Sequence, residues 1–348
     1  MGDLHRRSVR YREGLLMVIA AAPRVDVQRF HDDGYLLIED VFDPVRDLDP
    51  VVAEYEAKLD RVATQWAADG TIASTYADLP FTQRFARILN HAGNPGYRPF
   101  DICLGGPFRA DEPLDASMHA GPAVFDLIRH PRLLDVIERL IGGEILSNPI
   151  QHVRIKPPEA MLRDDLTKRN TMMAAVAWHQ DQGVALPEID DTDILTVWFP
   201  VLDATVENGC LCVIPGSHQR GMLLHCPSKP DQAFDLRIPD EIRGAAGFPV
   251  PMKRGSILVM HRLTMHSSLS NKSDGVRWSF DLRYQPIGQP TGRPWFPSFV
   301  ARSHQDPSQE VHDWRDWASL WETTRQRLAA DATGMKPRRW TGTEEACA

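Results

Sequence analysis

The amino-acid sequence predicts a mainly β domain, a barrel or a sandwich, with helices before and after it. Between residues 144 and 286, short apolar runs alternate with turn residues, as they do in all-β proteins. Residues 46–68 and 312–330 instead carry apolar side chains at the spacing of an amphipathic helix. We therefore expect a β core at 144–286 with helices on both sides of it in the chain.

Residues 26–330 are predicted to form a single domain, because 348 residues with 43% hydrophobic content suit one large core with additions. Its N-terminal helices occupy 26–143, and a C-terminal coil and helix occupy 287–330. Residues 331–348 form a tail. Residues 1–25 combine basic side chains with a short apolar run, as a signal peptide does, but acidic residues interrupt the basic stretch. We expect a flexible extension there.

The elements of the N-terminal region follow from local patterns. A short helix precedes Tyr35–Ile38, whose apolar run predicts a strand, and the helix at 46–68 comes next. Residues 70–120 contain glycine, proline and turn residues throughout, so we expect irregular structure. A helical pair follows at Ala123–His130 and Pro131–Ile141, and two glycines end it.

The core is expected to contain several short strands with turns between them. They are Ile145–Leu146, Gln151–Lys156, Ala177–Asp181, Ile194–Val201, Cys210–Ile214, Ser256–Met260 and Arg277–Tyr284. Two longer loops, at 159–175 and 218–254, interrupt this series. Loops of that length usually cover or bind a ligand.

Charge and cysteine content narrow the class of protein. The formal net charge of −8 argues against a nucleic-acid partner, whose binding needs a basic surface. The five cysteines are odd in number and irregular in spacing, which argues against a disulfide framework or a zinc site and favours a reducing, cytoplasmic location. No apolar run approaches the roughly 20 residues of a membrane span. We expect a monomer or homodimer that acts on a small molecule.

A possible metal-binding pair lies in the segment Trp178-His179-Gln180-Asp181. In an extended segment, the side chains of residues i and i+2 point to the same face, so His179 and Asp181 can occupy adjacent positions on one metal ion. Two histidines and one carboxylate are the ligand set of non-haem Fe(II) oxygenases. Taken alone, the pair is more often a surface or hydrogen-bonded pair. The third ligand is expected from a later strand, where His261 and His266 are the candidates.

The last predicted strand alternates between two kinds of side chain. Trp278, Phe280, Leu282 and Tyr284 share one face, whereas Arg277, Ser279, Asp281 and Arg283 share the other. If the apolar face packs on the helices, the charged face lines the barrel interior, where charges require partners or ligands. Arg277 and Ser279 there suit one carboxylate of a 2-oxo acid. The alternative is a strand whose polar face, with Asp281 and Arg283, is simply solvated.

Several other residues are expected to be structural. His152, His218 and His261 are interpreted as structural or loop histidines. Cys210 and Cys212, two apart on a strand, are interpreted as core residues. His179, Asp181 and a later histidine, together with Arg277 and the strand-rich sequence around them, favour a functional site over these structural alternatives.

Several motifs then combine into a family pattern. They are Phe30-His31-Asp32-Asp33-Gly34-Tyr35, His179-Gln180-Asp181, the segment from Asn208 to His218, the segment from His266 to Asn271, and Arg277. With them, residues 27–286 resemble the phytanoyl-CoA dioxygenase family of Fe(II)/2-oxoglutarate-dependent oxygenases. The resemblance implies a double-stranded β-helix (jelly-roll, cupin-like) core. The family usually has glycine after its distal histidine, where this chain has Ser267.

The resemblance also implies a set of site residues. His179, Asp181 and His266 would bind iron, and Arg277 would bind the distal carboxylate of 2-oxoglutarate. Further cosubstrate contacts are expected from residues near these positions, namely Ser279, Ser268, Trp198 and Gln151. O₂ is the remaining cosubstrate, and succinate and CO₂ are released. Family members that halogenate have a small residue at the position of Asp181, so its presence favours hydroxylation.

The substrate is not indicated by any motif. Basic residues of the 159–175 loop and the last strand suit an acidic or carboxylate-bearing molecule, and the set is Arg163, Lys168, Arg169 and Arg283. Solvated loop charges are an equal alternative. Desaturation, epimerisation or ring chemistry at the same site remains open, and so does a jelly-roll protein that binds a ligand without catalysis.

Overall fold

The computed structural model describes residues 23–162, 173–227 and 236–333, and within the tail residues 335, 339–340, 342 and 345–347. Its α-helices are α1 (Val27–Asp33), α2 (Asp49–Ala68), α3 (Phe81–Ala92), α4 (Leu114–Ser117), α5 (Pro122–Ile128), α6 (Pro131–Ile141), α8 (Asp240–Arg243) and α9 (Trp314–Ala330). Its strands are β1 (Tyr35–Ile38), β2 (Ile145–Lys156), β3 (Leu195–Pro200), β4 (Leu211–Val213), β5 (Cys226–Pro227), β6 (Leu236–Arg237), β7 (Phe248–Val250), β8 (Ile257–His261), β9 (His266–Ser268), β10 (Arg277–Pro286) and β11 (Phe299–Arg302).

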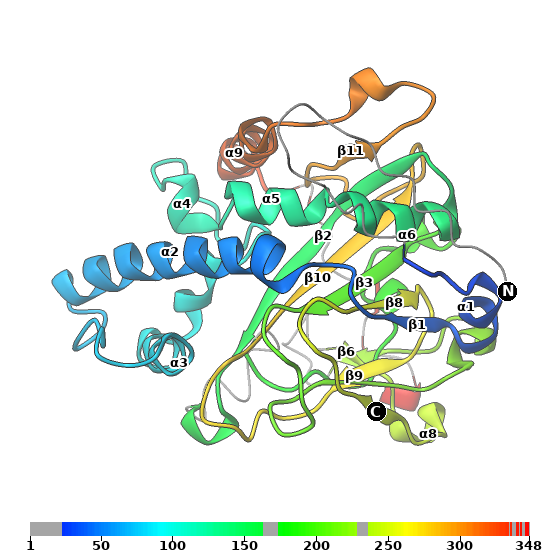
Figure 1. The fold of residues 1–348 in the computed structure, drawn as a ribbon, viewed down its shortest axis with the longest axis horizontal. Coiled ribbons are helices and arrows are strands. Elements are labelled where there is room, and N and C mark those ends of the chain that lie inside the picture. Colours follow the sequence, from blue (N-terminus) through cyan, green and yellow to red (C-terminus); the bar gives the residue numbers. More distant parts are fainter. Residues whose placement is uncertain are drawn as a thin grey trace, which may run out of the picture.

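The strands form two main antiparallel sheets. The larger sheet has the order β1-β8-β3-β10-β2-β11, and the smaller has the order β7-β4-β9. Strands β5 and β6 form a separate hairpin-like pair. Helices α2, α5 and α6 lie along one face of the larger sheet (Figure 1). This mainly β architecture with flanking helices and a jelly-roll core confirms the predicted fold class.

The two faces of β10 differ as their sequence predicts. Trp278, Phe280 and Leu282 belong to the main hydrophobic core, which they share with residues of α2, α3, α5 and α6. For example, the ring of Trp278 lies 4.8 Å from that of Tyr55 on α2. The opposite face, from Arg277 to Arg283, points into the space between the sheets and is buried as well. The solvated alternative is therefore wrong, and a row of charged groups lies inside the protein.

The helices that cover the larger sheet end where their sequences predict. α6 has Pro131 at its first turn, a position where no intrahelical N–H bond is lost. It ends at Gly142, whose φ of 87° is readily available only to glycine. Its apolar stripe, including Leu133 and Ile137, is fully buried. Amphipathic packing of this kind covers the apolar face of the sheet, so the charged face of β10 lies on the side away from these helices.

Three sequence-based expectations about secondary structure are wrong. The stretch 70–120, expected to be irregular, contains the helices α3 and α4. Both helices are short, so the periodic pattern of their apolar residues is weak. The coil expected after residue 286 contains β11, which pairs with β2 at the edge of the larger sheet. Ala177–Asp181 is not a strand. His179 forms one isolated antiparallel bridge, and Asp181 begins the 3-10 helix η4 (Asp181–Val184).

The cysteines also differ from expectation, because Cys226 and Cys347 form a disulfide. The two residues are 121 positions apart, and no spacing rule could pair them. Cys103, Cys210 and Cys212 are free and buried, which confirms the core assignment of the last two. In the part of the chain that the structure describes, no helix has the length and apolar character needed to cross a membrane.

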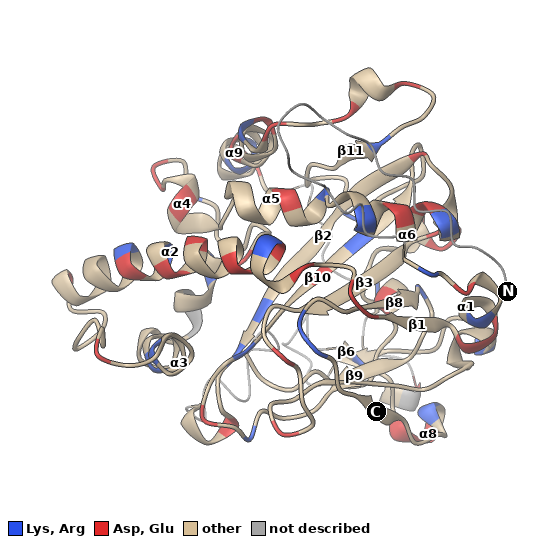
Figure 2. Ribbon diagram, viewed as in Figure 1, with Lys and Arg blue, Asp and Glu red and all other residues tan. Residues whose placement is uncertain are grey.

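Acidic and basic residues are interspersed over the helices, and basic residues also lie along the long strands of the larger sheet (Figure 2).

Segments 163–172 and 228–235 fall outside the described residues, and with them the expected substrate contacts Arg163, Lys168 and Arg169.

Candidate metal centre

His179, Asp181 and His266 come together at the end of the interior between the sheets. One ligand atom from each lies within 4.8 Å of the others. Oδ1 of Asp181 is 3.7 Å from Nε2 of His179 and 3.8 Å from Nε2 of His266. Of the two later histidines, His266 is the one in this group, as the family resemblance implied. His261 instead packs against Phe30 and against His218, whose ring centroid is 5.0 Å away.

Backbone hydrogen bonds place the two imidazoles. His179 and His266 each donate a backbone N–H to the carbonyl of the other, at 3.0 Å in both directions. In each ring Nδ1 lies within hydrogen-bonding distance of a carbonyl two residues earlier, on Ala177 at 2.9 Å and on Thr264 at 3.0 Å. A proton on Nδ1 satisfies these carbonyls and leaves the Nε2 lone pair facing Asp181, as a metal ligand requires.

Electrostatics keep His266 and Asp181 in the protonation states that bind a metal. Burial, and then the neighbouring His179, lowers the pKa of His266 to about 4, so its ring is neutral at neutral pH. Burial alone would raise the pKa of Asp181, but Arg283, and then the two histidines, hold that pKa well below its usual range. The site therefore offers a neutral imidazole from His266 and a carboxylate from Asp181, beside the ring of His179.

Both oxygens of Asp181 have partners outside the metal centre. Nη2 of Arg283 donates to Oδ1 at 2.5 Å, and both side chains are almost completely buried. The hydroxyl of Thr196, on β3, donates to Oδ2. Arg283 also lies 3.4 Å from Asp281 and donates to the carbonyl of Ile150 at 3.0 Å. The carboxylate is thus fixed in orientation from two sides.

Arg283 stays a predicted substrate contact, but its surroundings indicate a second role. Its Nη groups are engaged by Asp181 and by the Ile150 carbonyl, and its side chain is only 4% exposed. Charged side chains that pair inside a barrel are difficult to distinguish from ligand-binding ones in a sequence, because both alternate with apolar residues. The structure supports a role for Arg283 in holding Asp181.

A pair of buried cations lies beside the metal centre. Arg277 and Lys156 are register partners on β10 and β2, and each is 1% exposed. Burial, and then Arg154, lowers the pKa of Arg277 to about 9. Burial, and then Arg277, holds the pKa of Lys156 well below its usual range. Among the residues that the structure describes, no carboxylate forms an ion pair with either cation, and Nε of Arg277 has no hydrogen-bond partner.

Of the predicted cosubstrate contacts, Ser279 and Trp198 lie beside Arg277, whereas Ser268 lies beside Lys156. Ser279 accepts a hydrogen bond from Nη1 of Arg277, and the Trp198 ring lies 5.5 Å from the guanidinium carbon. Ser268 accepts from Nζ of Lys156 at 2.6 Å. Gln151 is buried at a break in register between β2 and β10 and donates to the carbonyl of Ile102 at 3.3 Å.

Lys156, Thr196 and His225 were not predicted to belong to the site. Lys156 could have been found from the alternation of β2, since it closes the row in which Arg154 and His152 also lie. Thr196 carried no signal, because a threonine on a strand is ordinary. His225 lies 45 positions after Gln180, and only the fold shows that its Nε2 accepts the backbone N–H of Gln180 at 2.9 Å.

The residues fit iron together with a 2-oxo dicarboxylate. The donor set is that of non-haem Fe(II) oxygenases. Arg277 and Lys156 are buried without a carboxylate partner among the described residues, so they provide a place for the far carboxylate. His266 and Ser268 are two residues apart on the short strand β9, so one face of that strand joins the metal centre to Lys156. A short molecule with a carboxylate at each end can span the two.

The ion pair between Arg283 and Asp181 gives a prediction about stability. Arg283→Met leaves Asp181 and Asp281 buried with too little positive charge, and breaking a buried pair in this way costs about 3–5 kcal/mol. We expect that loss in the free energy of unfolding of the metal-free protein, measured by urea denaturation. Arg302→Met is the control, because Arg302 pairs with the more exposed Asp135 and Glu138 and should cost less than about 1 kcal/mol. Equal losses in the free energy of unfolding for Arg283→Met and Arg302→Met would contradict the importance of the buried ion pair.

Comparisons with known proteins agree with this geometry. Residues 30–279 match the family described as phytanoyl-CoA dioxygenase (PhyH). The mouse phytanoyl-CoA dioxygenase domain-containing protein 1 is 24% identical over 292 residues, which cover 78% of this chain and 91% of the mouse protein. The 1-deoxypentalenic acid 11-beta-hydroxylase of Streptomyces exfoliatus is 25% identical over 285 residues, which cover 78% of this chain and 86% of that enzyme.

Among solved structures, the apo form of the non-heme monooxygenase ThoJ aligns with a TM-score of 0.52. The two chains are 18% identical, and the alignment covers 88% of this chain and 99% of ThoJ. At that identity the likeness concerns the fold.

Proposed function

We propose that this chain, a member of the phytanoyl-CoA dioxygenase family, hydroxylates a small organic molecule that carries a carboxylate. Like its family, it is an oxygenase that depends on iron and 2-oxoglutarate. The observation that carries this proposal is the complete donor set of His179, Asp181 and His266 beside a buried pair of cations without a carboxylate partner among the described residues. The name of the Streptomyces relative, a hydroxylase of a carboxylic acid, supports the proposed reaction and substrate class.

Iron and 2-oxoglutarate, when bound, supply the oxidising chemistry: 2-oxoglutarate and O₂ yield succinate and CO₂, and one oxygen atom enters a C–H bond of the substrate. The residues of the chain bind and orient these groups. His179, Asp181 and His266 are proposed to hold the iron, and Thr196 and Arg283 to fix the carboxylate ligand.

Arg277 and Lys156 are proposed to bind the far carboxylate of 2-oxoglutarate, with Ser279 and Ser268 as supporting hydrogen-bonding groups. The Trp198 ring, 5.5 Å from the guanidinium carbon of Arg277, would lie beside the bound carboxylate. Both cations are shielded by the two sheets, so the site excludes bulk water, and their attraction for an anion is stronger than it would be at the surface. Gln151 stays a predicted cosubstrate contact.

A succinate-release screen tests the proposed function. The protein, loaded with Fe(II) and 2-oxoglutarate in air, is incubated with small carboxylic acids, amino-acid derivatives and acyl thioesters. We expect succinate to form in excess of the background for at least one carboxylate-bearing compound, with a product heavier by one oxygen atom. If succinate forms together with a product lighter by two hydrogens, the reaction is desaturation and the proposed hydroxylation is wrong. A protein that binds both groups but releases no succinate would be a non-catalytic ligand-binding protein.

A further inference from the structure

The C-terminal tail reaches back to the metal centre, although it lies about 60 residues beyond the end of the family match. Nε of Arg339 donates to the carbonyl of Ala185 at 3.0 Å, and its Nη2 donates to that of Leu186 at 3.2 Å. The same guanidinium pairs with Asp190 and is 7% exposed. These contacts tie the tail to the segment that directly follows the metal ligand Asp181.

Trp340 makes the contacts nearest the metal. Its indole Nε1 donates to the carbonyl of Gly183 at 2.7 Å, inside the single turn η4 that Asp181 begins. Its ring stacks on His225, with centroids 5.8 Å apart and an interplanar angle of 21°. A Cβ added to Gly183 would lie 2.2 Å from the His225 ring, so glycine at 183 permits this close packing.

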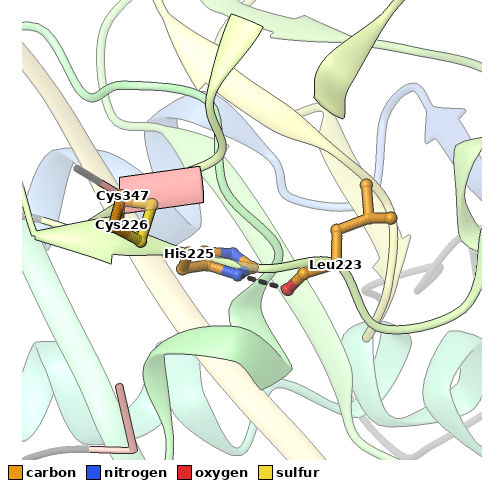
Figure 3. The surroundings of a disulfide bond; sticks show 4 residues. All are labelled: Leu223, His225, Cys226 and Cys347. Carbon is orange, nitrogen blue, oxygen red and sulfur yellow. Dashed lines mark hydrogen bonds between the residues drawn. A yellow bond between two sulfur atoms is a disulfide. The ribbon is translucent and has the colours of Figure 1, made fainter. Parts of the chain in front are cut away.

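His225 contacts both Trp340 and the segment that carries the metal ligands His179 and Asp181. It is completely buried, and its Nδ1 lies 2.9 Å from the carbonyl of Leu223, as Figure 3 shows. With the proton on Nδ1, Nε2 accepts the backbone N–H of Gln180 at 2.9 Å. Gln180 lies between His179 and Asp181 in the chain. A continuous path of packed groups therefore runs from the tail to the residue that separates two proposed iron ligands.

A covalent bond fastens the tail at this place. Cys226 directly follows His225 and is bonded to Cys347 (Figure 3). Gly342 also lies against Pro227, the residue after Cys226. The disulfide therefore anchors the end of the chain beside His225, and Arg339 and Trp340 hold the chain a few residues earlier.

We propose that the tail is a brace for the iron site, in which Arg339 and Trp340 are positioning residues for the Asp181 segment and the Cys226–Cys347 disulfide fastens them. This inference rests on the proposed iron-binding role of His179, Asp181 and His266. Reduction by a dithiol transfers two electrons and two protons to the disulfide, so Cys226 and Cys347 become thiols and the dithiol becomes a cyclic disulfide. The brace is then released, and the protein binds Fe(II) more weakly.

The test measures the Kd for Fe(II) in the full-length protein under anaerobic conditions. The natural chain, Cys347→Ser and Trp340→Phe are compared, each before and after treatment with dithiothreitol that is removed by desalting. Trp314→Phe is the matched control, because Trp314 lies at the start of α9, in contact with the main core. Loss of an outer-shell contact typically weakens metal binding roughly 10–100-fold, and we expect about a 10-fold higher Kd for Cys347→Ser, Trp340→Phe and the reduced natural chain.

The expected pattern is specific to the brace. Cys347→Ser should not respond to reduction, and Trp314→Phe should match the natural chain. Two results would overturn the proposed role of the disulfide. One is a Kd of the natural chain that reduction does not change, and the other is a non-reduced peptide map without the Cys226–Cys347 link. An unchanged Kd in Trp340→Phe overturns the positioning role. If even the oxidised natural chain fails to bind Fe(II), the proposed function itself fails. Melting temperatures of the metal-free variants separate a loss of folding from a loss of metal binding.

Discussion

Asp181→Ala is expected to weaken Fe(II) binding by more than about 100-fold and to abolish succinate release. Loss of a residue that only hydrogen-bonds to a metal ligand weakens binding roughly 10–100-fold, and this substitution removes a ligand itself. The same result is expected for His266→Ala. Asp181 also neutralises Arg283, so its loss leaves a buried guanidinium with only Asp281 as an acidic partner. Asp181→Asn, which keeps the shape and an oxygen for Arg283, distinguishes loss of the ligand charge from loss of folding.

His261→Ala is the matched control for the histidine ligands. His261 is five positions before His266, and burial, and then His218, lowers its pKa to about 4 as well. It nevertheless lies against Phe30 and His218 and not beside Asp181. The control should therefore retain Fe(II) affinity and turnover within a few-fold. Loss of iron in His261→Ala, with retention in His266→Ala, would show that the wrong histidine had been assigned.

Arg277→Leu is expected to raise the KM for 2-oxoglutarate by about 10- to 150-fold, since hydrogen bonds to a charged group contribute roughly 1.5–3 kcal/mol and each 1.36 kcal/mol is a factor of ten. Lys156→Met should raise it less, by about 10-fold, because Lys156 is a point charge without a bidentate fork. In both variants kcat at saturating 2-oxoglutarate should change less than KM does. Equal KM values in the variants and the natural chain would contradict the assigned pocket.

The same cations give a stability and a pH prediction. Each is buried without a carboxylate partner among the described residues, so Arg277→Leu should leave the ligand-free protein as stable as the natural chain or more stable. A bound dianion raises the pKa of Lys156 from its depressed value in the free protein. Binding therefore takes up a proton, and affinity for 2-oxoglutarate falls as pH rises above the free-state pKa. Calorimetry in buffers of different ionisation enthalpy should detect this uptake in the natural chain but not in Lys156→Met.

Much of the core of the site was predictable because strand alternation determines which side chains share an interior. Arg277 and Ser279 alternate with Trp278 and Phe280, and that pattern alone places the first pair opposite the helices. The pair His179 and Asp181 was found although its segment is not a regular strand. Gln180 has extended backbone angles, and this was sufficient for the two ligands to converge before η4 begins.

Other parts of the site depend on contacts between distant segments, which no local pattern encodes. The role of Arg283 required knowing that Asp181 lies next to it, 102 positions earlier in the chain. Residue spacing alone left both His261 and His266 open; the family resemblance implied His266, and the bridge between His179 and His266 agrees with it. The disulfide between Cys226 and Cys347 depends on the path of the tail, which carries no periodic signal.

The most direct test of the proposed iron and 2-oxoglutarate site is an anaerobic absorbance titration of the metal-free protein with Fe(II) and 2-oxoglutarate. A weak visible charge-transfer band should appear only when both are present, because it requires the 2-oxo acid to chelate the iron. We expect the band in the natural chain and in His261→Ala, its loss in Asp181→Ala, and a higher 2-oxoglutarate concentration for half-formation in Arg277→Leu. A natural chain without the band, or an undiminished band in Asp181→Ala, would contradict the assignment of the site.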